Sequence, residues 1–211
     1  DISRQAVADD LRAIRETVAR GLRMMLMLNV PATVGLMVLA EPIVELIYQR
    51  RMFLPADTVA TAAALMFYAP GLLGYSAVKI ASPTFYSLRD SRTPVTVSVI
   101  SVLVNLGLNL ALVRVMGFRG LALGTAIAAV FNSLALLWLL RRRLGGLGGR
   151  LLLETLLKVS AASAAMGLAA WLTLQWITGV LPGAGEIAKG VRVFTSIGVA
   201  VIVLGAAAKL M

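Results

Sequence analysis

The chain has 211 residues, of which 59% are hydrophobic and 14% are charged, with a mean hydropathy of +0.89. Soluble domains carry about 25% charged residues, so this composition excludes an ordinary soluble domain and indicates an integral membrane protein. The sequence contains neither cysteine nor histidine, which excludes disulfides, thiolate sites, the usual general base and most zinc sites.

The formal net charge of +10 comes from basic residues that flank long apolar runs. They are not grouped with aromatic side chains on one face, as in nucleic-acid-binding proteins, so we interpret them as signals of membrane topology and expect no nucleic-acid partner. The sequence begins at Asp1, without a methionine or a signal-like segment. We therefore expect it to be a piece of a longer polypeptide.

Residues 1–20 predict an amphipathic helix on the cytoplasmic side, because apolar side chains recur at helical spacing among charged ones: Val7, Leu11, Ile14 and Val18. Six apolar runs follow, each long enough to cross a bilayer: 22–48, 58–88, 95–113, 121–140, 153–177 and 191–210. The sequence thus predicts an all-α integral membrane protein with six transmembrane helices. The second run is long for one span, so we expect tilt or a break near Pro70 and Gly71.

The stretch 79–94 predicts a tight, charged elbow between the second and third spans. Pro83 removes a backbone donor near the end of one helix, and Pro94 suits the first turn of the next. The charged residues that meet water there are Arg89, Asp90 and Arg92. A second short turn, at 116–120, makes the third and fourth spans antiparallel neighbours.

Six spans place both termini on one side of the membrane. That side carries most of the basic residues: Arg4, Arg12, Arg15, Arg20, Arg23, Arg89, Arg92, Arg141, Arg142, Arg143, Arg150, Lys158 and Lys209. The opposite side carries fewer: Arg50, Arg51, Arg114, Arg119, Lys189 and Arg192. By the positive-inside rule, both termini are expected in the cytoplasm, and the run 141–143 is interpreted as an orientation signal that contacts anionic lipid.

The most specific pattern in the chain is Lys79 followed by the elbow Phe85-Tyr86-x-x-x-Asp90-x-x-Thr93-Pro94. Other motif residues lie on both sides of it: Arg51-Met52-Phe53, Asp57, Thr61, Pro83, Gly120-Leu121-Ala122-Leu123-Gly124 and Asn132. Together these residues resemble the MurJ/MviN family of bacterial lipid II flippases, within the multidrug/oligosaccharidyl-lipid/polysaccharide exporter superfamily. The match runs over essentially the whole chain.

The resemblance implies a fourteen-helix, two-lobe transporter of the bacterial cytoplasmic membrane, of which this chain would be the last six helices. Such a protein moves lipid II, the lipid-linked peptidoglycan precursor, from the inner to the outer leaflet by alternating access. Most arginines that face the pyrophosphate would precede this chain. The implied division is an amphipathic helix over 1–20, part of the C-terminal lobe over 21–143, and two additional helices over 144–211 that form a groove for the lipid tail.

Two groups of polar residues have open interpretations. Lys79 either snorkels to the cytoplasmic interface or faces a cavity as a cation, and the elbow charges Arg89, Asp90 and Arg92 are either a solvated loop or hold a cytoplasmic gate closed by salt bridges between lobes. Glu41 and Glu45 share a helix face near the outer end of the first span, where we expect them to meet water.

Asn105 and Asn109 lie one helical turn apart on the third span, and Thr125 lies on the adjoining fourth span. They are either hydrogen-bonding contacts between helices or oxygen ligands of a cation. Some proteins that resemble this chain place sodium at the equivalent helices. Because both asparagines are neutral, we expect weak or no sodium binding in this chain alone, and no other cofactor.

Other functions stay open on the sequence. The same superfamily contains exporters of drugs and of other lipid-linked oligosaccharides, which lack the specific lysine and Phe-Tyr elbow. A membrane-embedded glycosyl or phosphoryl transferase would need a carboxylate or histidine cluster at a membrane face, and we find none in the sequence. No single residue argues against a purely structural membrane subunit.

Overall fold

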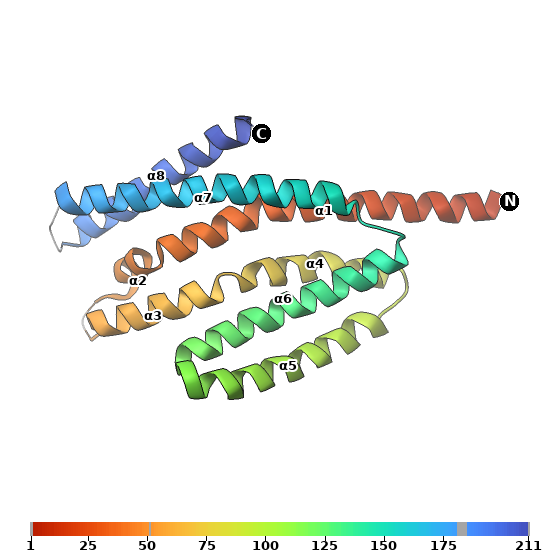
Figure 1. Cartoon of the computed structure of the whole chain (residues 1–211), viewed down its shortest axis with the longest axis horizontal. Coiled ribbons are helices and arrows are strands. Elements are labelled where there is room, and N and C mark those ends of the chain that lie inside the picture. Colours follow the sequence, from red (N-terminus) through yellow and green to blue (C-terminus); the bar gives the residue numbers. More distant parts are fainter. Residues whose placement is uncertain (1, 51, 181–184, 211) are drawn as a thin grey trace. The chain divides into compact units, whose positions relative to one another are not determined.

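A computed structural model of the chain describes residues 2–50, 52–180 and 185–210. Within these ranges the chain forms eight helices and no strand (Figure 1): α1 (Ile2–Val38), α2 (Ala40–Tyr48), α3 (Pro55–Tyr68), α4 (Gly71–Ser87), α5 (Arg92–Met116), α6 (Phe118–Arg143), α7 (Gly149–Val180) and α8 (Glu186–Leu210). The predicted all-α class is confirmed.

Five of the described helices contain segments that are long and apolar enough to cross a membrane: α1, α5, α6, α7 and α8. The pair α3 and α4 passes the same test together but is bent by 41° at its break, which is the geometry of a broken span or of a re-entrant loop. The count of up to six spans agrees with the prediction, and the chain is a multi-pass membrane protein. The expected break near Pro70 and Gly71 is also confirmed, because α3 ends at Tyr68 and α4 begins at Gly71.

The first span differs from the prediction of one uninterrupted helix over residues 22–48. Residues 2–20 are helical, as expected, and α1 continues from them to Val38. The helix then breaks at Leu39, and α2 follows as a separate helix. Pro42 explains the position of the break, since it has no N–H for the Val38 carbonyl and its ring clashes with the carbonyl four residues earlier.

The chain divides into two compact units. Unit 1 contains Asp1–Asn29 and Pro70–Leu157, and unit 2 contains Val30–Ala69 and Lys158–Met211. These units are groups of residues that pack together. The predicted division at residues 20 and 143 instead separates segments by their expected functional roles. The predicted domain boundaries therefore stay a prediction.

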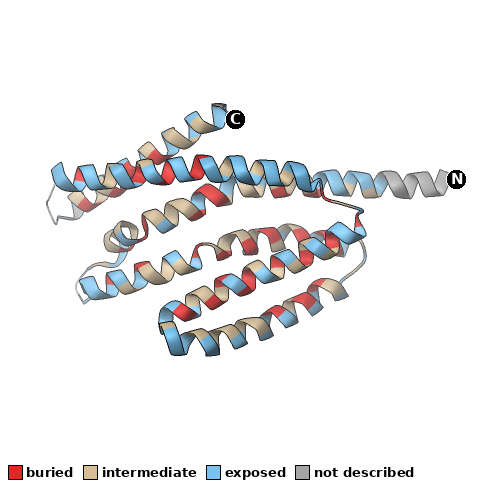
Figure 2. Cartoon of the chain, in the orientation of Figure 1, coloured by how far each residue is buried: buried red, intermediate tan, exposed pale blue. Residues whose placement is uncertain are grey.

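In unit 1, α6 lies between α4 and α5 and packs against both (Figure 1). Buried residues follow α6 along its length (Figure 2), and its Leu136 and Leu140 are fully buried in the core beside Phe85 of α4. Small residues allow the close approach: a Cβ on Gly74 would lie 2.5 Å from the Ala129 carbonyl carbon. Close contact between small residues is the usual way in which membrane helices pack.

The α5–α6 hairpin is tighter than the predicted turn over 116–120. Gly117 alone links the helices, with φ of 60° and ψ of −137°, a conformation that favours glycine. A Cβ on Gly120 would lie 2.4 Å from the Leu112 carbonyl oxygen, and one on Gly124 would lie 2.4 Å from Asn109 Oδ1. The expected antiparallel neighbours are confirmed, and glycines at these three positions permit their contact.

Unit 2 has two small cores. In the first, Ala40 and Val44 of α2 pack against Ala62 of α3. The start of α3 is well defined, because Pro55 is its first residue and the Asp57 carboxylate accepts a hydrogen bond from the Leu54 N–H at 2.9 Å. The second core joins residues of α7 and α8 to the α1–α2 break: Leu39, Met166, Ala170 and Ala200.

Candidate functional site

The elbow between α4 and α5 begins with a closed helix end. The Asp90 N–H donates to the Phe85 carbonyl at 2.9 Å and the Arg89 N–H donates to the Tyr86 carbonyl at 3.0 Å. These two bonds define a Schellman motif, in which the residue after the C-cap takes the left-handed conformation. Here that residue is Arg89, with φ of 58°, although glycine is the usual choice.

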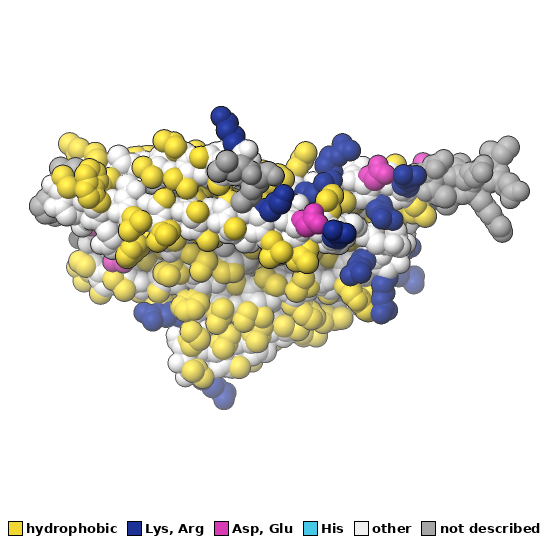
Figure 3. All heavy atoms as spheres, turned by 45° about the horizontal axis from the view of Figure 1, so that its top comes forward, with side chains coloured by type: hydrophobic (Ala, Val, Ile, Leu, Met, Phe, Trp, Pro, Cys, Tyr) yellow, Lys and Arg dark blue, Asp and Glu magenta, His cyan; other side chains and the backbone are white. Residues whose placement is uncertain are grey.

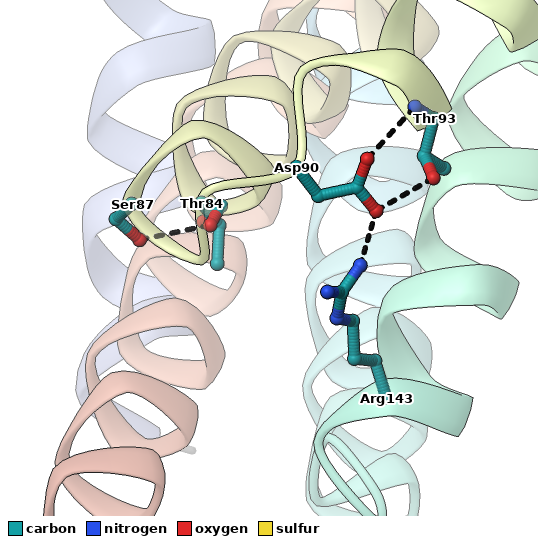
Figure 4. A network of polar contacts seen from close by, with 5 residues as sticks. All are labelled: Thr84, Ser87, Asp90, Thr93 and Arg143. Atoms are coloured by element: carbon teal, nitrogen blue, oxygen red, sulfur yellow. Dashed lines mark hydrogen bonds and ion pairs between the residues drawn. The ribbon is translucent and has the colours of Figure 1, made fainter.

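Asp90 opens the next helix. Its Oδ1 accepts the Thr93 N–H at 3.0 Å, and its Oδ2 accepts the Thr93 hydroxyl at 2.7 Å (Figure 4). The carboxylate therefore caps the N-terminus of α5, where a negative charge also interacts favourably with the helix dipole. Pro94 lies in the first turn of this helix, as expected from the sequence, and it is buried.

Arg143, the last residue of α6, points at the same carboxylate and pairs with Asp90 Oδ2 (Figure 4). The Asp90 side chain is only 15% exposed, whereas that of Arg143 is 46% exposed. Hydrogen bonds from the Thr93 backbone and hydroxyl, together with the Arg143 guanidinium, hold the pKa of the Asp90 carboxyl below its ordinary value of 3.8. One carboxylate thus joins the α4–α5 elbow to the end of α6.

The other charged residues singled out at this end have no ion pair with any residue that the structure describes: Lys79, Arg89 and Arg92. All three are exposed in the chain. Around Lys79, the lack of an N–H on Pro83 leaves the Lys79 carbonyl without its helical donor. The Thr84 and Ser87 hydroxyls donate to helix carbonyls in the last turns of α4, at 2.8 Å each.

The asparagines of α5 bond to each other, since Asn109 Nδ2 donates to Asn105 Oδ1 at 3.0 Å. The Thr125 hydroxyl donates to the Leu121 carbonyl of its own helix at 2.8 Å. Asn109 Oδ1 is buried without a hydrogen-bond partner, and it faces the bare backbone of Gly124. The pair therefore lies against α6, at the contact that the hairpin glycines permit.

Asn105 and Thr125 line a shared groove of about 290 Å³, whose other polar lining residues include Ser98, Ser101 and Asn132. Asn109 is not among its lining residues. All the side-chain oxygens that could bind a cation here are neutral, and Asn105 Oδ1 already accepts a hydrogen bond from Asn109. These side chains by themselves therefore fit a sodium ion poorly. Among the described residues there is also no group of three or more Asp or Glu side chains that could hold a metal.

At the far end of α2, in unit 2, Glu45 has a partner that sequence reasoning missed. Lys189 Nζ of α8 lies 3.5 Å from Glu45 Oε1 and 3.5 Å from Gln49 Oε1. The Lys189 side chain is only 10% exposed. Glu45 therefore does not simply meet water, and the ion pair connects α2 to α8.

The family to which the chain belongs follows from comparison with known proteins. A family model described as lipid II flippase MurJ matches residues 1–183. The chain belongs to the MurJ family. The resemblance carried by the elbow motif is thereby confirmed.

MurJ proteins of several bacteria are similar to this chain. A probable lipid II flippase MurJ from Rickettsia prowazekii is 36% identical over 132 residues, which are 63% of this chain and 26% of that protein. Another from Bdellovibrio bacteriovorus is 35% identical over 152 residues, or 72% of this chain and 29% of that protein. The chain thus spans less than a third of the length of these MurJ relatives.

A solved MurJ structure has the same fold. It is described as lipid II flippase MurJ in an inward closed conformation, and it matches with a TM-score of 0.74 at 24% identity. The match covers 93% of this chain and 40% of that one. The chain therefore shares part of the MurJ fold.

Proposed function

We propose that this chain is the C-terminal part of a lipid II flippase. In this proposal the whole protein moves the lipid-linked peptidoglycan precursor from the inner to the outer leaflet of the bacterial cytoplasmic membrane, by alternating access between two lobes. The observation that carries the proposal is the family match over residues 1–183, together with relatives named as lipid II flippases. The process is transport, without a covalent step, so we do not propose an enzyme.

The elbow supports a role in gating. The Asp90 carboxylate accepts hydrogen bonds from the Thr93 N–H and hydroxyl and pairs with Arg143. These contacts fix the backbone of the segment between α4 and α5. Arg89 lies in this segment and Arg92 is the first residue of α5, and both are exposed. We propose that these two arginines contact acidic groups of the other lobe when the cytoplasmic side closes, and that Lys79 contributes a cation to the transport path.

The distribution of charge supports the expected topology. Lys and Arg side chains gather at the end of unit 1 where α1, α6 and α7 come together, and hydrophobic side chains cover much of the remaining face (Figure 3). We propose that this end, the elbow and both termini are cytoplasmic. Arg51, which was assigned to the outer side, lies outside the described residues.

The two last helices are proposed to form the groove for the lipid tail. Large apolar side chains on α7 and α8 are exposed, among them Leu168, Trp176 and Phe194. Such a surface suits contact with an acyl or polyprenyl chain. For the asparagine pair we propose a packing role, with sodium binding only if a carboxylate from outside this chain joins Asn105, Asn109 and Thr125.

A depletion experiment tests the proposed function. The full-length protein that contains this chain is produced in bacteria from which the native lipid II flippase is depleted, and the lipid II accessible at the outer face of the membrane is measured. The proposal expects accessibility and growth to be restored. Failure of a stably produced, membrane-inserted protein to restore accessibility would overturn it and favour another exporter substrate. Residues 1–211 alone serve as the control and are expected to restore nothing, since they lack the second lobe.

A further inference from the structure

The cytoplasmic end of unit 1 contains two adjoining cavities that the proposed transport cycle does not use. The larger, of about 570 Å³, lies beside the connector between α6 and α7, and its lining includes Arg15, Arg141 and Arg150. The second, of about 520 Å³, shares Arg15 and lies along α1. Three helices therefore each bring one guanidinium to the larger cavity.

The connector builds the floor of this cavity. Leu144 and Leu147 are buried in the core of unit 1, at 8% and 5% exposure, so the connector is fixed at two points. Between and after them, Gly145, Gly146 and Gly148 have positive φ, which leucine or alanine would adopt only with strain. The Gly146 N–H donates to the Arg141 carbonyl at 2.9 Å. The result is a bare backbone surface with an arginine at its edge.

The charges around the cavity are not balanced. Arg15 Cζ lies 3.9 Å from the point where a Cβ on Gly146 would be, so its guanidinium lies over the connector. Neither Arg15 nor Arg141 has an ion pair with any residue in the described ranges. Glu154, the only acidic lining residue of the larger cavity, pairs with Arg150 at 3.2 Å, and both side chains are half exposed or more.

Two candidate membrane spans end or begin beside the cavity. Arg141 is in the last turn of the α6 span, and Arg150 is in the first turn of the α7 span. Phosphate groups of a bilayer lie where apolar spans end, and the planar guanidinium matches phosphate oxygens with two parallel hydrogen bonds. The start of α7 adds the positive end of a helix dipole.

We propose that Arg15, Arg141 and Arg150 bind the phosphate of an anionic phospholipid from the cytoplasmic leaflet. The bound lipid connects α1 at Arg15 to the α6–α7 connector, whose Leu144 and Leu147 share a core with Val18 and Leu22 of α1. The site is separate from the proposed lipid II path, so it does not depend on which substrate is transported.

Lipid titration of the full-length protein in neutral detergent micelles tests the site. Phosphatidylglycerol or phosphatidylcholine is added, and binding is followed by native mass spectrometry and by the thermal midpoint. We expect the double variant Arg15→Gln/Arg141→Gln to bind phosphatidylglycerol at least about tenfold more weakly than the parent, because charge-assisted hydrogen bonds contribute about 1.5–3 kcal/mol and 1.4 kcal/mol is tenfold.

The matched control is Arg20→Gln/Arg142→Gln, which removes the same charge from the same two helices without touching either cavity. The control is expected to change affinity less than about threefold, by screening alone. Equal losses in both double variants would mean diffuse surface attraction and would overturn the site. If a glutamine variant is unstable, Arg15→Lys/Arg141→Lys keeps the charge and should still lose most of the preference, since lysine lacks the planar fork.

Inorganic phosphate and glycerol phosphate form the second arm of the titration. Both carry the same anionic group without acyl chains, and we expect neither to raise the thermal midpoint at millimolar concentration. If either does so in the parent and fails in the Arg15→Gln/Arg141→Gln variant, the cavity binds a soluble phosphate and the lipid assignment is wrong.

Discussion

Asp90 and Arg143 are 53 residues apart in the sequence and form an ion pair at the junction of α4, α5 and α6. The same carboxylate caps α5 through Thr93. Removing Asp90 therefore removes two interactions, while removing Arg143 removes one. We expect Asp90→Ala to lower the thermal midpoint more than Arg143→Gln, as measured by differential scanning fluorimetry. The decrease in the double variant should not exceed the sum of the decreases in the two single variants, because Asp90→Ala already removes the ion pair.

The pH dependence of stability reports on the same carboxylate. The pKa of Asp90 is lower in the folded protein than its ordinary value of 3.8, so its contribution to stability is fully present above that value and is lost as pH falls through the folded-state pKa. The difference in thermal midpoint between the parent and Asp90→Asn should be constant from pH 7 to 5 and shrink below about pH 4. A difference that instead grows on acidification would contradict the assignment.

Arg89 occupies a backbone conformation that favours glycine. Arg89→Gly should therefore stabilise the folded protein by about 0.5–1 kcal/mol, whereas Arg89→Ala should not, because alanine has the same left-handed penalty. Unfolding in mixed micelles measures the difference. If the side chain also serves the proposed gate, Arg89→Gly will be more stable and less active, which separates the two roles of this position.

Close helix packing in unit 1 can be tested with two glycines that differ only in their surroundings. Gly74→Ala places a Cβ 2.5 Å from the Ala129 backbone and should cost about 1–3 kcal/mol by overpacking. Gly107→Ala, on α5, meets nothing within 4 Å and should be neutral or stabilise by up to about 1 kcal/mol. Equal effects of the two changes would show that the α4–α6 contact is looser than described.

Asn109→Asp tests the sodium interpretation. The change supplies the negative ligand that the neutral amides lack, at an oxygen that is buried beside Gly124. If Asn105, Asn109 and Thr125 can converge, the full-length variant should be stabilised by sodium chloride more than by potassium chloride at equal ionic strength, by an amount that rises with concentration. No difference between the two salts, combined with an Asn105→Ala variant that loses only stability, would leave helix packing as their role.

Cysteine labelling tests the topology. In a cysteine-free full-length background, a cysteine at Ser91 in the elbow should resist an impermeant thiol reagent in intact cells and react in inverted vesicles. A cysteine at Phe118, in the α5–α6 hairpin, should show the opposite pattern. The hairpin position is exposed in the structure, so a lack of reaction on both sides would not result from burial. Labelling of Ser91 from outside would reverse the assigned orientation.

The number of spans and the α3–α4 break could be predicted from local chemistry. Apolar length determines where a chain can cross a bilayer, and Pro70 with Gly71 marked the α3–α4 break. Pro42 lies just after the α1–α2 break, but Pro31 and Pro83 lie inside α1 and α4, so a proline alone does not locate a break. Sequence reasoning assigned the whole run to one span because hydrophobicity continues across the break.

Contacts between distant residues were harder to predict. The sequence predicted that Asp90 lies at water, but its partner follows 53 residues later on another helix. One signal was available: Asp90 is the only acidic residue between Asp57 and Glu154, and several arginines share its side of the membrane. For Glu45 and Lys189, opposite charges at the same predicted membrane face gave a similar signal, but only packing of α2 against α8 selects this pair.

The single-residue link at Gly117 has a consequence for how the chain enters the membrane. A connection of one residue leaves no hydrophilic loop that could be exported by itself, so we expect α5 and α6 to enter the bilayer together as a hairpin with Gly117 leading. In the proposed topology the tip that crosses carries Arg114 and Arg119, and Arg119 Cζ lies 5.8 Å from the ring centroid of Phe118, a cation–π contact that partly offsets its charge. We therefore expect the insertion of α5 during biosynthesis to wait until α6 has been synthesised.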